Sequence, residues 1–465
     1  MMRILPMVLA VALFMEHVDS NVITTSLPAI AADLNTSPIA LKLAMTSYLV
    51  ALSVFIPISG FMADRFTARV IFRMAIVVFL VGSVCCALSF SLHSFVVSRF
   101  LQGMGGAMMT PVGRLLLVKS TPKDELVIAL AWFSVPALIG PLIGPPLGGF
   151  ITTYFSWHWI FLINIPIGFI GLILSTIYLP KDEMKVLRPL DWTGFLLSAI
   201  ALSGFIFGLS IISLPALPQS VGLSITIIGL ITGGFYIRHA KNKDEPLLNL
   251  RLFADPVFAR SIIGGSIFRL GIGAVPFLLP MMLQLSFGLS PVQSGMMVLA
   301  AALGALGMKF GAREVYAHFG FRKTLMTGAI ISAMFTASND LFFPTTSYWI
   351  MVPVLLVGGF LRSLFFSGVN ALAFADIKKQ ELSQATPIAA VAQQASMALG
   401  IAIAGAVLEI SSSFHDNILK LGDFHISFFI VAAISALAFF VFLGLPPDAG
   451  HALNKTRERT VKKTD

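Results

Sequence analysis

Charged residues are scarce in this sequence. Asp, Glu, Lys and Arg make up 11% of its 465 residues, whereas an average soluble protein contains about 25%. Hydrophobic residues make up 57% of the chain, and the few charged residues are not enough to cover the surface of a soluble protein of this size. The shortage excludes an ordinary soluble domain, and the long apolar runs predict an all-α polytopic membrane protein in contact with the lipid bilayer.

Cysteine and catalytic motifs are also missing. The two cysteines, Cys85 and Cys86, are adjacent and lie in an apolar run, which fits neither a disulfide nor a metal-ligand spacing. The chain has no His-Glu-x-x-His metal motif, no Gly-x-Ser-x-Gly nucleophile turn and no phosphate-binding loop. We therefore expect no metal, no cofactor and no enzymatic activity.

The apolar runs predict 14 spanning helices joined by short connections. Their expected limits, good to a few residues, are 5–28, 43–62, 71–91, 94–116, 127–149, 158–179, 192–212, 220–238, 258–283, 292–311, 323–340, 347–372, 385–410 and 425–445.

The net charge of +9 is explained by where the cations lie along the chain. Nearly all loop Lys and Arg residues fall on the same side as the N-terminus, and only Lys42 and Lys420 fall on the other side. Such an asymmetry predicts a protein of the cytoplasmic (inner) membrane with both termini in the cytoplasm. The charge is a topology signal, so no nucleic-acid partner is expected.

A faint internal repeat predicts the domain organisation. Residues 64–69 (DRFTAR) follow the second predicted span, and residues 317–322 (AHFGFR) follow the tenth. If these turns correspond, two six-helix bundles enclose an inserted pair of helices. The expected units are an N-terminal bundle, a linker with the inserted pair, a C-terminal bundle and a basic cytoplasmic tail, at residues 1–180, 181–256, 257–446 and 447–465.

A glycine- and proline-rich stretch organises the fifth predicted span. Glycines recur every fourth residue and form a bare stripe that lets a neighbouring helix approach closely, while prolines interrupt the backbone hydrogen bonds and bend the helix. The pattern is typical of a helix that rocks against its neighbour, and equally of ordinary packing in a membrane. The residues concerned are Gly140, Pro141, Gly144, Pro145, Gly148 and Gly149.

Several motifs together resemble the 14-helix drug:proton antiporter branch of the major facilitator superfamily. The stretch just described is similar to its fifth-helix motif. Residues 60–65 (GFMADR) resemble its loop after helix 2, although Thr67 and Ala68 stand where the family usually has Gly and a basic residue. Further matches are residues 18–23 (VDSNVI), 99–107 (RFLQGMGGA) and 157–168 (WHWIFLINIPIG), with weaker echoes at 191–194 (DWTG) and 246–253 (PLLNLRLF).

The resemblance implies a major facilitator fold and a function. The protein is expected to be a proton-coupled antiporter that exports small amphipathic or drug-like molecules by alternating access. Periplasmic or outer-membrane efflux proteins are candidate partners. Export of one native metabolite or siderophore-like anion stays open as an alternative, and a membrane sensor that transports nothing is the alternative from another class.

Two acidic residues in the first span are the candidates for proton coupling. Glu16 and Asp19 lie three residues apart and share a helix face. A carboxylate at mid-membrane costs about 2.5–3.5 kcal/mol, so it must be neutralised, paired or hydrated. Asp19 carries the family match and is the expected carrier, with or without Glu16, unless the acids form a static pair with a cation. Arg99, in the fourth-helix motif, is the expected coupling charge; the alternative is that it reaches the membrane surface.

Two further sets complete the candidates. Arg269 and Arg362 lie deep in predicted spans and need an anionic partner or a wet cavity. We expect them to line a substrate cavity together with polar and aromatic residues of several helices. The expected cavity residues are Asn21, Gln102, Arg269, Gln284, Arg362, Phe366, Asn370, Gln393 and Gln394. Asp64 and Arg65, with Gly60, are expected to form a gate that holds the halves together on the cytoplasmic face. The alternative for this turn is a solvated loop.

Overall fold

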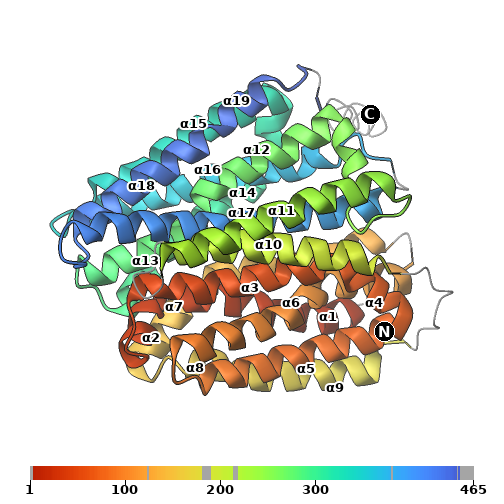
Figure 1. Cartoon of the computed structure of the whole chain (residues 1–465), viewed down its shortest axis with the longest axis horizontal. Coiled ribbons are helices and arrows are strands. Elements are labelled where there is room, and N and C mark those ends of the chain that lie inside the picture. The colour runs from red at the N-terminus through yellow and green to blue at the C-terminus, as the bar shows by residue number, and fades with distance from the viewer. Residues whose placement is uncertain are drawn as a thin grey trace, which may run out of the picture.

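The computed structural model describes residues 4–122, 125–180, 190–212, 218–378, 381–447 and 449–450. Every regular element in these ranges is a helix, which confirms the all-helical fold. The long helices run roughly parallel, with the earlier helices in one group and the later ones in another (Figure 1). Two parts of the expected linker, at 181–189 and 213–217, and most of the expected tail, at 451–465, lie outside the described residues.

The first half of the molecule is built from the helices that precede residue 180. Short 3-10 turns join several of them: η1 (Ile23–Thr25), η2 (Pro38–Leu41) and η3 (Ile56–Ile58). The helices are α1 (Ile4–Val22), α2 (Leu27–Asp33), α3 (Lys42–Phe55), α4 (Ser59–Phe66), α5 (Ala68–Ala87), α6 (Leu92–Ser120), α7 (Leu126–Tyr154), α8 (Trp159–Leu162) and α9 (Asn164–Tyr178).

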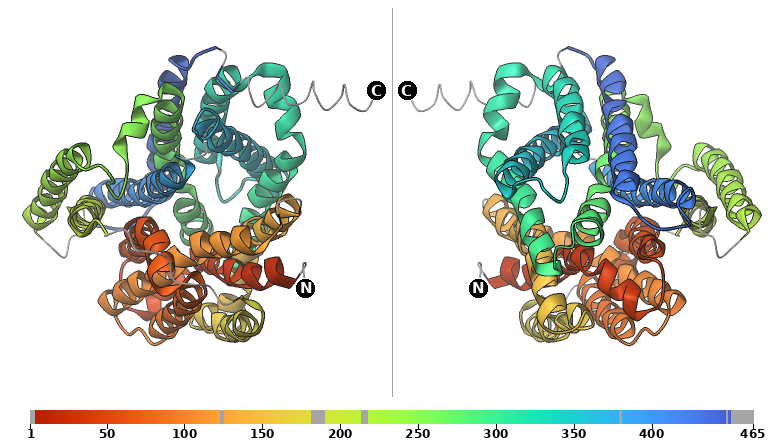
Figure 2. Two further views of the ribbon diagram at one scale, coloured as in Figure 1. Left: turned by 90° about the vertical axis from the view of Figure 1, so that its right-hand side faces the viewer. Right: turned by 90° about the vertical axis from the view of Figure 1, so that its left-hand side faces the viewer.

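The second half begins after a pair of helices that lies to one side of both halves (Figure 2). This pair is α10 (Trp192–Ile212) and α11 (Gln219–Asn242). The second half contains η4 (Leu250–Ala254), α12 (Pro256–Ile272), α13 (Val275–Leu285), α14 (Pro291–Phe319), α15 (Phe321–Ala337), η5 (Ser338–Leu341), α16 (Tyr348–Ala373), α17 (Leu382–Ser413), α18 (Leu421–Ala436) and α19 (Ala438–Leu443).

Twelve helices among the described residues are long and apolar enough to cross a membrane. Two further long helices, α6 and α15, are not among the twelve but pack inside the bundles, α6 against α5 and α3, and α15 against α16 and α18. The expected total of 14 spans is compatible with this arrangement.

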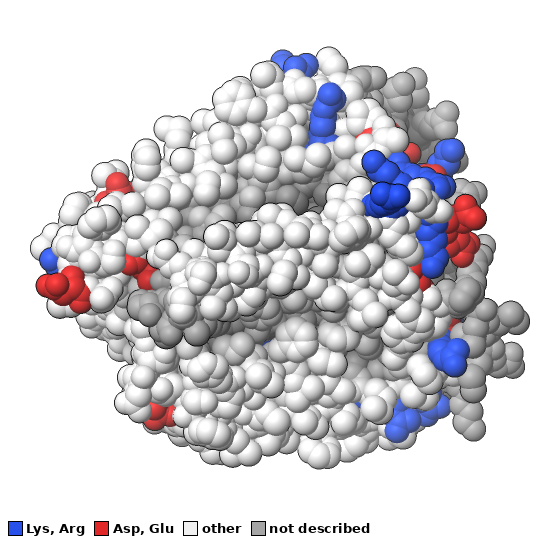
Figure 3. All heavy atoms as spheres, in the orientation of Figure 1, with Lys and Arg blue, Asp and Glu red and all other residues white. Residues whose placement is uncertain are grey.

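The two ends of the helix bundle differ in charge. Most Lys and Arg side chains visible in Figure 3 lie at or near the end where α1 begins, on the right and upper right of the view. We call this the basic end, and the opposite end, reached by α1 at Val22, the far end. The distribution is the one that the loop cations predicted from the sequence.

The two halves share the conformation of one turn. Thr67, between α4 and α5, has φ 69° and ψ 142°, and Gly320, between α14 and α15, has φ 74° and ψ 164°. Positive φ suits glycine but strains a β-branched residue. The match supports the predicted repeat, and the positive φ favours glycine at both positions.

The halves meet along two seams. In one, α7 packs against α14; in the other, α3 packs against α17. Helix α10 of the pair covers the second seam, because its Ile206 lies in one apolar cluster with Val50 and Val54 of α3 and with Ala398 of α17. One helix of the pair therefore contacts both halves at once.

Candidate functional site

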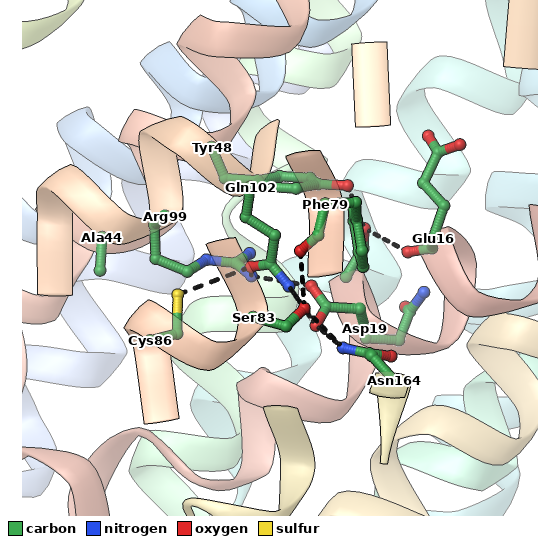
Figure 4. Close-up of polar contacts among 12 residues, drawn as sticks. Glu16, Asp19, Ala44, Tyr48, Phe79, Ser83, Cys86, Arg99, Gln102 and Asn164 are labelled. Carbon is green, nitrogen blue, oxygen red and sulfur yellow. Dashed lines mark hydrogen bonds and ion pairs between the residues drawn. The ribbon is translucent and has the colours of Figure 1, made fainter. Parts of the chain in front are cut away.

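A buried polar cluster lies in the middle of the first half (Figure 4). Asp19 of α1 accepts three bonds: Arg99 Nη1 donates to Oδ2 at 2.8 Å, while Gln102 Nε2 and Asn164 Nδ2 donate to Oδ1 at 2.8 and 2.7 Å. Asp19 and Arg99 are only 2% and 1% exposed. Because all three partners donate, the cluster is matched to an ionised carboxylate.

Glycines in α6 explain how this cluster forms. A Cβ on Gly103 would lie 2.7 Å from the Tyr48 carbonyl oxygen of α3, and one on Gly105 would lie 2.5 Å from the Phe79 nitrogen of α5. Gly82 of α5 has the same role on the neighbouring helix, because a Cβ there would meet the Gln102 backbone of α6. Bare backbone on both helices lets α6 pack closely enough to carry its polar side chains into the interior.

Tyr48 holds the charged end of Arg99. The guanidinium carbon lies 4.3 Å from the centre of the Tyr48 ring, a cation–π contact that is strongest where water is excluded. The Tyr48 hydroxyl accepts a hydrogen bond from Ser20 at 3.2 Å. Arg99 Nε has no hydrogen-bond partner among the described residues, and the hydrogen bonds to Asp19 and Gln102 both come from Nη1.

Glu16 is held differently from Asp19. Its carboxylate points away from Asp19 (Figure 4) and accepts a hydrogen bond from Thr110 Oγ1 at 2.9 Å. It is 8% exposed, and no described cation forms an ion pair with it. The shared face that the sequence predicted therefore carries one acid with a cation and one without.

The glycine stripe of α7 packs directly on the helix that carries these acids. A Cβ on Gly140 would lie 2.5 Å from the His17 Cβ, one on Gly144 would lie 2.5 Å from the Asn21 Cβ, and one on Gly148 would meet the Val22 carbonyl oxygen. The close approach expected of the stripe is present, and its partner is α1.

The far-end part of α7 also meets the second half. A Cβ on Gly149 would meet the Pro291 carbonyl oxygen of α14, and a Cβ on Gly295 of α14 would meet the Pro145 carbonyl oxygen. Thr153 Oγ1 accepts a hydrogen bond from the Val292 nitrogen at 3.1 Å. Helix α7 thus contacts α1 on one face and α14 on another.

The polar candidates for the cavity fall into separate places. Gln102 is fully buried in the Asp19 cluster. Asn21 donates to the His17 carbonyl at 2.7 Å, and Gln284 of α13 donates to the Thr25 carbonyl of the first half at 2.9 Å. In this structure, all three side chains bind protein groups, and Asn21 and Gln284 remain half-buried.

The other cavity candidates gather in the second half. Arg269 Nη2 donates to Asn370 Oδ1 at 3.2 Å, and its guanidinium carbon lies 4.9 Å from the centre of the Phe366 ring. Arg362 lies one turn from Phe366 on α16 and is half-buried, as are Gln393 and Gln394 on α17.

The expected gate residues lie at the basic end. Asp64 is 4.0 Å from Lys119 Nζ of α6, which belongs to the same half. The guanidinium of Arg65 lies 5.8 Å from the ring of its neighbour Phe66, and Gly60 has open space where a Cβ would be. These contacts lie within the first half, so the gating role stays a prediction.

Three polar residues that make buried contacts in the structure were assigned no site role from the sequence. Asn164, inside the 157–168 motif, was assigned no role but binds Asp19. Lys42, expected in a loop, is instead fully buried at the start of α3, where its Nζ lies 2.7 Å from Glu409 Oε2 of α17. Glu409 could have been noticed as a lone carboxylate in an apolar run.

The two weaker motif echoes meet in space beside the helix pair. Asp191, before α10, accepts hydrogen bonds from Lys243 Nζ at 2.9 Å and from the backbone nitrogens of Gly194 and Leu247. His239 of α11 lies 2.8 Å from the same carboxylate. Burial opposes ionisation, but these bonds outweigh it and lower the pKa of Asp191. The cluster ties both helices of the pair to the segment that leads into α12.

Two groups of apolar helices joined along two seams, with a buried ion pair inside the first group, define a polytopic membrane transporter. The family model described as "Major Facilitator Superfamily" matches residues 9–198 and 261–465. The chain belongs to this superfamily. Its members are transporters, so the expectation that the protein is not an enzyme is confirmed.

Individual relatives agree with this assignment. The chain is 36% identical over 456 residues to the "Putative multidrug resistance protein MdtD" of Escherichia coli O6:H1, covering 95% of this chain and 94% of that protein; the protein of the same name from Salmonella paratyphi B is equally similar. Two solved structures share the fold: a D-xylose-proton symporter (TM-score 0.69, 16% identity, 96% and 98% of the chains) and the nucleoside transporter NupG (0.65, 13%, 94% and 99%).

Proposed function

We propose that this protein exports small amphipathic or drug-like molecules across the cytoplasmic membrane, driven by protons that move inward. The observation that carries the proposal is the buried ion pair between Asp19 and Arg99. Asp19 lies on α1, which packs against α7, and α7 in turn packs against α14 of the second half. The relatives at 36% identity, whose name refers to multidrug resistance, support the substrate class.

In this proposal, Asp19 carries the proton and Arg99 couples it to movement. Protonation removes the negative charge and leaves Arg99 as a buried cation without its partner. Breaking a buried pair in this way costs about 3–5 kcal/mol, enough to shift an equilibrium between two conformations about a hundredfold or more. Glu16 shares the proton, since it lies on the same helix and has no described cation beside it.

The charge distribution supports the proposed orientation. Cations on loops mark the cytoplasmic side, so the basic end faces the cytoplasm and the far end faces outward. Three described polar contacts join residues of α1–α9 to residues of α12–α19, and all three lie at the far end: Lys42 with Glu409, Gln284 with Thr25 and Val292 with Thr153. In the proposed orientation, these contacts belong to a state that is closed on the outside.

The test is proton movement coupled to a solute in proteoliposomes with an imposed pH gradient. Three naphthalene compounds serve as probes because they share one apolar body: 1-naphthoate, 1-naphthamide and 1-naphthylmethylammonium. A proton-coupled exporter moves at least one probe uphill while protons move across the membrane in the opposite direction, and that probe in turn stimulates proton flux. A sensor that transports nothing would bind a probe without moving it or protons.

A further inference from the structure

Two arginines of the second half lie about halfway through the membrane. Arg269 is near the middle of the span Pro256–Leu285, and Arg362 is near the middle of α16. A lone cation at this depth costs about 2.5–3.5 kcal/mol even on lenient scales. Each guanidinium therefore needs a carboxylate, a wet space or a bound anion.

No described carboxylate neutralises either arginine. Asp19 is paired with Arg99, Glu16 binds Thr110, and Glu409 is paired with Lys42. Arg269 binds only a neutral amide and an aromatic ring, and Arg362 makes no hydrogen bond or ion pair within the described part of the chain. The second half therefore presents two positive charges that its own side chains leave uncompensated.

The two arginines lie near one aromatic residue, Phe366: Arg269 contacts its ring, and Arg362 lies one helical turn from it on α16. Arg362, Phe366 and Asn370 are four residues apart on α16 and form one stripe, and Arg269 contacts the second and third of them. Gly265 makes room for Arg269, because a Cβ there would lie 3.0 Å from Arg269 Nη1. The stripe is accessible, since Asn370 is exposed and the other two are half-buried.

We infer that Arg269 and Arg362 bind the anionic group of the transported molecule, with Phe366 against its apolar body. A planar guanidinium donates two parallel bonds to a carboxylate or another oxyanion. An aromatic residue that contacts one such group and lies one helical turn from the other fits a small amphiphile with one negative end. The inference deepens the proposed export function, on which it rests, by assigning the substrate to the organic anions.

The three naphthalene probes test this charge directly. Binding to the purified protein is measured by calorimetry, with no pH gradient, so that it does not depend on proton coupling. Naphthoate should bind at least about tenfold more tightly than the amide or the ammonium compound, because charge-assisted hydrogen bonds are about twice as strong as neutral ones. Arg362→Gln and Arg269→Gln should each weaken naphthoate binding about tenfold or more.

Two controls separate a binding role from a structural one. Arg114→Gln makes the same chemical change at an exposed position of α6 and should leave naphthoate binding unchanged. Arg362→Gln should not lower the melting temperature of the ligand-free protein, because it removes an uncompensated charge. If Arg362→Gln unfolds the protein, Arg362→Lys, which keeps the charge but not the planar fork, should still weaken binding.

The outcomes distinguish this inference from the proposed function. The assignment to anions would be overturned if naphthoate failed to bind, if all three probes bound equally, or if naphthoate binding survived both substitutions. Transport of the ammonium compound would then still support export. Arginine-dependent binding of naphthoate without proton flux would support the anion site and contradict proton-coupled transport.

Discussion

At the scale of single residues, neighbours decide what two similar acids can do. Asp19 accepts bonds from Arg99, Gln102 and Asn164, whereas Glu16, three residues earlier, accepts one from Thr110. Spacing along the helix could not reveal this difference, because it depends on which side chains of α6 and α9 reach α1.

Arg99→Lys should impair proton coupling more than substrate binding. Arg99 Nη1 donates to both Asp19 and Gln102, and the guanidinium lies over Tyr48. Lysine keeps the charge but loses the planar fork and the stacked contact. We expect probe-stimulated proton flux to fall about tenfold or more, while calorimetric affinity for the transported probe stays within about twofold. A parallel fall in both would make Arg99 a substrate or structural residue.

Thr67→Gly should stabilise the protein. A non-glycine residue at positive φ costs of order 1–2 kcal/mol, and Thr67 has φ 69°. Its side chain accepts a hydrogen bond from the Val70 nitrogen at 3.4 Å, but replacing such a cap by glycine costs only a few tenths of a kcal/mol. Relief of strain is the larger effect, so the melting temperature should rise by a few degrees.

The matched control for that change is Gly320→Thr in the second half. Gly320 has φ 74°, so threonine there should lower the melting temperature by a similar amount. If Thr67→Gly also lowers it, the side-chain cap outweighs the backbone strain.

At the scale of elements, α7 is the helix whose behaviour follows most directly from its sequence. The four-residue glycine spacing predicted a close neighbour, and α1 is that neighbour. The second contact of α7, with α14, was not predictable, because it depends on how the two halves meet.

Gly144→Leu should leave membrane insertion intact and reduce transport about tenfold or more. Even a Cβ at this position would lie 2.5 Å from the Asn21 Cβ, so a leucine must push α7 away from α1. The matched control is Gly234→Leu in α11, where nothing lies within 4 Å of a Cβ. Normal probe transport by Gly144→Leu at normal expression would show that the stripe is ordinary packing.

At the scale of the whole molecule, the sequence predicted the fold class but not the contacts between the halves. The apolar runs, the loop cations and the repeated turn were sufficient for the helical bundles and their charged end. The ion pair between Lys42 and Glu409 was not predicted, because the two residues are distant in sequence and Lys42 was expected in a loop. The separation of the polar candidates into an Asp19 set and an Arg269 set likewise depends on tertiary packing.

Breaking the Lys42–Glu409 pair should open the far end. The side chain of Lys42 lies along Gly405, where a Cβ would meet its stem, and removing one partner of a buried pair costs about 3–5 kcal/mol. In Lys42→Met, the distance between spin labels at Ala32 and Thr345, exposed positions on opposite halves, should lengthen. Adding Glu409→Gln removes the stranded charge and should shorten it again. An unchanged distance in Lys42→Met would show that the pair does not hold this end closed.

The central claim is that Asp19 carries the proton, and Asp19→Asn in proteoliposomes tests it most directly. Asparagine has nearly the shape of a protonated aspartate, so the fold should survive, but it cannot release a proton. With the transported probe present and withheld, we expect probe-stimulated proton flux and uphill accumulation to disappear while downhill exchange persists. Glu16→Gln should weaken accumulation without abolishing it. Full pH-driven accumulation by Asp19→Asn would contradict the account and transfer the role to Glu16.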